Sequence, residues 1–161
     1  MFPTEPLSVP KPADAFEFNL EDEPISLHWA AIQHDVQTFV SVRNKAPAKQ
    51  ARDKDIALKR FRPGHEFQSG VRLEDLGKTY GVSRERIRQI QEKGIKAVAM
   101  RSTTNPRATG QVVAALFDRY GRGSDNDDMR WLMQILFEEQ AAPVFGRVVL
   151  RVAAGVLKLD A

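Results

Sequence analysis

The segment LEDLGKTYGVSRERIRQIQEKGIKAV, residues 73–98, has the pattern of two helices joined by a short turn. Leu73 and Leu76 have the spacing of the buried face of a short first helix. Gly81 supplies the positive φ that a tight turn needs, and Ser83 is a favoured N-cap residue for the second helix. This succession predicts a helix-turn-helix.

The second helix of this motif has one apolar and one polar side. At about 100° per residue, Ile87, Ile90, Gly94 and Val98 fall on the apolar side. The opposite side carries groups that can bind base edges in the major groove, because Arg pairs with guanine, Gln with adenine and Glu with cytosine. These polar residues are Glu85, Arg88, Gln89, Glu92 and Lys96, with Arg84 in the exposed first turn. The alternative is a solvated helix face that contacts no DNA.

Positive charge is concentrated around this motif. The net charge of the whole chain of 161 residues is only +3. Residues 43–107 carry 17 Lys and Arg against seven Asp and Glu, a net charge of +10, whereas residues 1–42 have −6 and residues 108–161 have −1. Such a concentration is typical of a nucleic-acid site, although a solvated basic face has the same composition.

The segment resembles region 4 of housekeeping-type bacterial sigma factors, the domain that reads the −35 element of promoters. The resemblance rests on DLG at residues 75–77, VS at 82–83 and RERIRQI at 84–90. The upstream segment KDIALKRFRPG, residues 54–64, resembles the helix that precedes this motif in the family. The likeness covers residues 51–98 only.

The resemblance also implies roles for individual residues. The residues that would contact bases of a −35-like element are Arg84, Glu85, Arg88 and Gln89. The residues that would contact the DNA backbone or RNA polymerase are Arg72, Lys78, Ser83, Arg86 and Lys93. Because sigma region 4 also binds the flap of RNA polymerase, the implied partners are double-stranded DNA, bacterial RNA polymerase, or both.

The four residues that would contact bases are called the base-facing row below. Three positions depart from the family pattern, and none of them belongs to this row. Arg72 stands where the family favours Ser, Thr or Asn, so a helix cap is lost while a phosphate contact becomes available. Gln91 stands where the family usually has Glu. Gly94 replaces an Ala-like residue at a cost of about 1 kcal/mol of helix propensity. It either softens the end of the helix or lets another element pack closely against it.

The rest of the chain predicts an all-α fold, a helical bundle with added N- and C-terminal helices. Apolar residues recur at spacings of three and four in several stretches, among them residues 112–120, 129–137 and 144–157. The last of these is rich in β-branched residues but still favours a helix. The predicted parts are an acidic, Pro-rich mobile tail at 1–23, an N-terminal helix at 24–47, the DNA-binding domain at 48–104 and a C-terminal helical region at 105–161. This last region is expected to pack on the domain or to form a homo-oligomer.

Signals of other functions are weak. The chain has no cysteine and no apolar run of the roughly 20 residues that span a membrane, and its N-terminus lacks a signal-peptide pattern. We therefore expect a cytoplasmic protein, of a bacterium or of the host cell if a phage encodes it. His28, His34 and His65 lack metal-ligand spacing and are expected at surface or loop positions. No catalytic motif stands out, so we predict no enzyme, no metal and no cofactor.

Three functions stay open at this stage. The first is a transcription factor that works with RNA polymerase, as activator, repressor or sigma-like factor; no segment resembles the aromatic-rich sigma domain that opens the −10 element. The second is a DNA-binding repressor, or a phage DNA-packaging or assembly protein, unconnected to polymerase. The third is a protein that mimics region 4 without touching DNA, and the intact base-facing row argues against it.

Overall fold

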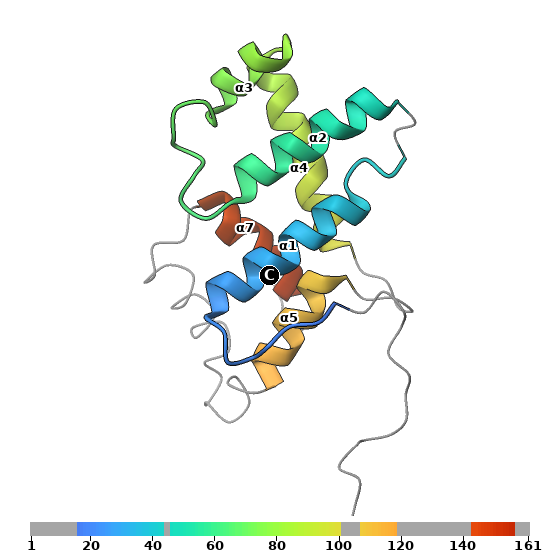
Figure 1. Cartoon of the computed structure of the whole chain (residues 1–161), viewed down its shortest axis with the longest axis vertical. Coiled ribbons are helices and arrows are strands. Elements are labelled where there is room, and N and C mark those ends of the chain that lie inside the picture. The colour runs from blue at the N-terminus through green and yellow to red at the C-terminus, as the bar shows by residue number, and fades with distance from the viewer. Residues whose placement is uncertain (1–15, 44–45, 101–106, 119–142, 157–161) are drawn as a thin grey trace, which may run out of the picture.

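The computed structural model describes residues 16–43, 46–100, 107–118 and 143–156, and Figure 1 shows their arrangement. Within these ranges the secondary structure is helical, and no strand is present. The prediction of an all-α fold is confirmed. The helices are α1 (Pro24–Phe39), α2 (Pro47–Phe61), α3 (Leu73–Tyr80), α4 (Arg84–Ala99), α5 (Ala108–Leu116) and α7 (Pro143–Val156).

The helix-turn-helix consists of α3 and α4, with α2 packed against α4 (Figure 1). Gly81 ends α3 in the left-handed region with φ of 66°, as the sequence predicts. Ser83 caps α4, since its Oγ accepts a hydrogen bond of 3.0 Å from the backbone N–H of Arg86. A small apolar core holds the motif together, formed by Ile56, Leu76, Ile87 and Ile90.

A larger core joins the N- and C-terminal helices to this motif. It is formed by residues of α1, α2, α4, α5 and α7, among them Ile32, Val36, Phe61, Ile95, Val113, Phe145 and Val148. The stripe at residues 144–157 is therefore helical where the structure describes it, as α7. The apolar stripe at residues 129–137 lies outside the described residues. Because the buried core residues of α5 and α7, among them Val113, Phe145 and Val148, pack within the chain itself, nothing in this part supports the expected homo-oligomer.

Helix α1 is buried on two sides rather than one. Besides the face in the large core, Leu27 and Ala31 pack against α5. Phe16, Phe18 and Leu20 pack partly buried on the same cluster. The chain therefore lies against the fold from residue 16 onward, which differs from the expectation of a mobile tail that reaches residue 23.

A further expectation about α1 is wrong. His28 is not at the surface, because it lies in α1 with only 2% of it exposed. The helix ends before Pro47, within the expected segment 24–47, but it does so already at Phe39, and Pro47 begins α2. The cause is a turn in which Ser41 has φ of 61° and its hydroxyl donates a hydrogen bond to the Asp53 carboxylate of α2, a contact between residues 12 apart in sequence.

None of the helices in the described ranges has both the length and the apolar content that a membrane crossing requires.

Candidate nucleic-acid interface

Two glycines let α4 approach its neighbours closely. A Cβ on Gly77 of α3 would lie 2.8 Å from the backbone carbonyl oxygen of Val82, in the turn that leads into α4. A Cβ on Gly94 would lie 3.1 Å from Cζ of the Phe61 ring in α2. Of the two alternatives for Gly94, the structure therefore shows the close approach of another element.

A buried arginine fixes α4 against α2 and the loop that follows α2. The Nε of Arg60 donates to Oε1 of Gln91 at 2.7 Å, and its Nη1 donates to the backbone oxygens of Glu66 at 2.9 Å and Val71 at 3.3 Å. Burial lowers the pKa of Arg60, and the nearby Glu66 carboxylate opposes that shift. Gln91, a departure from the family pattern, is thus an internal acceptor that faces away from solvent.

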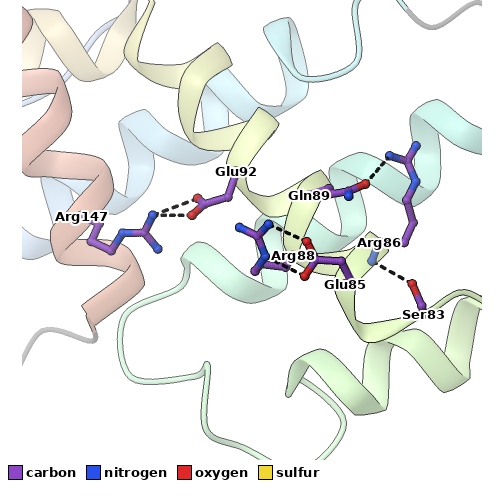
Figure 2. Close-up of polar contacts among 7 residues, drawn as sticks. All are labelled: Ser83, Glu85, Arg86, Arg88, Gln89, Glu92 and Arg147. Carbon is purple, nitrogen blue, oxygen red and sulfur yellow. Dashed lines mark hydrogen bonds and ion pairs between the residues drawn. The ribbon is translucent and has the colours of Figure 1, made fainter.

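The four candidate base-contacting side chains, Arg84, Glu85, Arg88 and Gln89, are all exposed on the first two turns of α4. Figure 2 shows three of them together on one side of the helix. Arg88 donates two hydrogen bonds to the Glu85 carboxylate, from Nε at 2.9 Å and from Nη2 at 2.6 Å. These hydrogen bonds lower the pKa of Glu85 and raise the pKa of Arg88, so both groups are charged at neutral pH.

Neighbouring charged residues connect this row to α3 and to the start of α4. The Nε of Arg84 lies 3.6 Å from a carboxylate oxygen of Glu74 in α3, and both side chains are exposed. The Nη1 of Arg86, a half-buried residue, lies 3.5 Å from Oε1 of Gln89. The N-terminal half of α4 therefore presents paired but solvent-accessible polar groups.

The remaining candidates for the DNA backbone or polymerase surround this row. Arg72, Lys78 and Lys93 are exposed, in front of α3, on α3 and on α4 respectively. No side chain caps the start of α3, as the loss of the family's Ser, Thr or Asn predicts. Arg72 instead donates from Nε to the backbone oxygen of Phe67 at 3.1 Å. In the described part of the chain, no three His, Asp or Glu side chains lie together as metal ligands would.

This part of the chain matches a known protein family. Residues 51–99 match the family model "Sigma-70, region 4". These residues form a sigma-70 region 4 domain. The match begins near the start of α2 and ends with α4, in agreement with the resemblance at residues 51–98. No curated protein and no solved structure gave a significant match to the chain. The region 4 domain is a DNA-binding helix-turn-helix of the kind found in transcription regulation.

On its exposed polar side, the region 4 domain also receives a contact from α7, which lies outside the family match. The Nη2 of Arg147 lies 2.6 Å from Oε1 and 2.9 Å from Oε2 of Glu92, on the polar side of α4 (Figure 2). The sequence analysis did not identify Arg147. A signal for Arg147 was present in the sequence. Arg147 and Arg151 are the charged residues of the apolar stripe at 144–157, and they lie four residues apart on one helix face.

Proposed function

We propose that the protein is a sequence-specific, non-enzymatic DNA-binding transcription factor. In this proposal its region 4 domain binds promoter −35-like DNA, bacterial RNA polymerase, or both. The observation that carries the proposal is the joint exposure of Arg84, Glu85, Arg88 and Gln89 on the first two turns of α4. Recognition helices of this motif present the residues of their N-terminal turns to base edges in the major groove.

The pairing of Arg88 with Glu85 is compatible with base recognition. The carboxylate holds the guanidinium of Arg88 extended along the exposed side of α4. Because ion pairs between exposed side chains contribute little to stability, Arg88 can exchange Glu85 for the O6 and N7 atoms of a guanine. Glu85 is then released to accept a hydrogen bond from a cytosine amino group.

The surrounding charge supports phosphate binding. Arg72, Lys78 and Lys93 are exposed around the base-facing row. They belong to the segment 43–107, whose net charge is +10. Contacts from such residues set the register of a protein on the duplex, while contacts to base edges supply specificity.

The proposal is tested by two parallel experiments on the purified full-length protein. Duplex DNA bound by the protein is selected from a random pool, and bacterial RNA polymerase is incubated with the immobilised protein. We expect an enriched sequence whose selection is lost in the Arg88→Ala variant, and we expect retention of polymerase. The result that would overturn the proposal is a pool without enrichment together with no retained polymerase.

The second candidate is a DNA-binding repressor, or a phage DNA-packaging or assembly protein, that does not involve polymerase. The observation in its favour is that the region 4 match ends at residue 99, while α5 and α7 beyond it pack on α1 and α4. An enriched DNA sequence that is unlike a −35 element, without retention of polymerase, would select this candidate.

A further inference from the structure

We propose that α7 is a second DNA-contacting element, in which Arg147 and Arg151 bind backbone phosphates beside the groove that receives α4. The inference rests on the proposed binding of DNA by α4. It adds to the region 4 domain a surface that lies outside residues 51–99.

Helix α7 is held in a fixed position next to α4. Phe145, Val148 and Val152 of α7 are buried in the large core, and α7 contacts both α2 and α4. The buried Glu66, in the loop between α2 and α3, accepts a hydrogen bond of 3.2 Å from the backbone N–H of Val144. The backbone oxygen of Glu66 also accepts from Arg60, whose Nε binds Gln91 of α4.

Arg147 reaches from this fixed helix to the edge of the base-facing row. Its partner Glu92 lies one turn after Arg88 on α4, so the two residues are neighbours on the helix surface. Figure 2 shows the Arg147 side chain extending from α7 to Glu92 beside Arg88. A phosphate next to the groove occupied by α4 would therefore lie within reach of α7.

The guanidinium of Arg147 can bind a phosphate without leaving Glu92. Both hydrogen bonds to Glu92 come from Nη2, whereas an arginine has five N–H donors. Among the described residues, no contact of Nε or Nη1 with a protein acceptor is present. The side chain is also 51% exposed, so these donors are accessible to a ligand.

The exposed side of α7 is purely basic. Arg147 and Arg151 are both exposed, lie four residues apart on one face, and are the charged residues of the segment 143–156. All seven acidic residues of the segment 108–161 fall outside α7, although that segment has a net charge of −1. An amphipathic helix with two arginines beside a DNA-reading helix fits an anionic backbone.

Glu92 is the acidic group in contact with Arg147, and its charge would repel a phosphate bound there. Its side chain is 35% exposed on the polar side of α4, and Arg147 compensates its charge. Removal of the Glu92 charge should therefore tighten DNA binding, because Arg147 then faces the phosphates alone. If Arg147 served only to hold Glu92 in place, the same change would weaken binding.

The test measures the binding of the full-length protein to two short duplexes over a range of salt concentrations. One duplex carries the sequence selected from a random pool, and the other has mixed sequence. The slope of log K against log salt should fall by about one for Arg147→Gln and by about one for Arg151→Gln, on both duplexes. Arg147→Lys keeps the charge and should keep most of the slope.

The matched control is Arg43→Gln, which removes the same charge from an exposed residue after α1, outside α3, α4 and α7. This control should leave the slope at the wild-type value, and Glu92→Gln should raise the affinity. Melting temperatures check that the variants fold. If Arg147→Gln lowers the melting temperature, Arg151→Gln still tests the proposal, since no hydrogen bond or ion pair of Arg151 is present among the described residues.

Several outcomes would overturn the inference. If Arg147→Gln bound DNA more tightly than the wild type, α7 would obstruct the groove. If Glu92→Gln weakened DNA binding as much as Arg147→Gln does, Arg147 would only position Glu92. Unchanged slopes in both arginine variants, while Arg88→Ala still loses affinity for the selected duplex, would reject the role of α7 and leave the proposed function intact. The absence of binding by the wild-type protein to either duplex would overturn both.

Discussion

The Oε1 atom of Gln91 accepts a hydrogen bond of 2.7 Å from the buried guanidinium of Arg60, and this contact joins α4 to α2. Gln91 is 3% exposed and Arg60 is 7% exposed, so water does not replace the contact if it is lost. A residue of α4 that faces away from the exposed polar row thus fixes the orientation of that helix.

Gln91→Leu should destabilise the fold by about 1–3 kcal/mol, because a buried guanidinium donor is left without its acceptor. Gln91→Glu should stabilise it by about 1 kcal/mol, since a carboxylate forms a charge-assisted hydrogen bond with Arg60. Urea denaturation measures both changes. The control is Gln89→Leu on the exposed side of α4, which should change stability by no more than about 0.5 kcal/mol. Equal stability of Gln91→Leu and the wild type would show that Arg60 does not depend on Gln91.

Gly77→Ala should destabilise the helix-turn-helix by about 1–3 kcal/mol. The new Cβ would lie 2.8 Å from the Val82 carbonyl oxygen, which belongs to the backbone and can move only if the turn moves. The same substitution at Gly146 of α7 is the control, because a Cβ there has no atom within 4 Å. Gly146→Ala should therefore stabilise the protein by up to about 1 kcal/mol through helix propensity. Thermal unfolding of both variants shows whether each substitution lowers or raises stability. A Gly77→Ala variant as stable as the wild type would contradict the close contact.

The buried His28 predicts a pH dependence of stability. Burial lowers its pKa from 6.5 to about 4, so the folded protein keeps it neutral while the unfolded chain takes up a proton at higher pH. The contribution of neutral His28 to the free energy of unfolding is therefore complete above pH 6.5. It is lost as the pH falls toward 4, by about 3 kcal/mol in all.

The free energy of unfolding of the wild type and of His28→Leu, measured from pH 7 to pH 4, tests this prediction. The difference between the two proteins removes the effect of Asp35, whose pKa is raised by burial in the folded state and which both proteins share. The variant should lose less stability than the wild type as the pH falls. Parallel curves for the two proteins would show that His28 is accessible to protons in the native state.

The helix-turn-helix could be predicted from the sequence because its determinants are local. The φ of Gly81 and the cap at Ser83 depend on residues within one turn, and the exposed row follows from the helical period. The base-facing candidates Arg88 and Gln89 lie on the exposed side for the same reason.

Contacts between distant segments could not be predicted in this way. Asp35 is buried because it accepts hydrogen bonds from the backbone N–H groups of Ala108 and Thr109, 73 and 74 residues away, at the start of α5. The contact of Arg147 with Glu92 spans 55 residues. Periodicity indicates that a helix has an apolar face. It does not indicate which helix covers a second buried side, as α5 covers that of α1.

The central claim is that α4 reads DNA sequence, and the affinities of Arg88→Ala and Gln89→Ala for two duplexes test it most directly. Each variant should bind the selected duplex roughly ten- to a hundredfold more weakly than the wild type, because one base contact is lost. Each should bind the mixed-sequence duplex nearly as well as the wild type, because phosphate contacts remain. Wild-type affinity of both variants for the selected duplex would contradict the claim that α4 is the recognition helix.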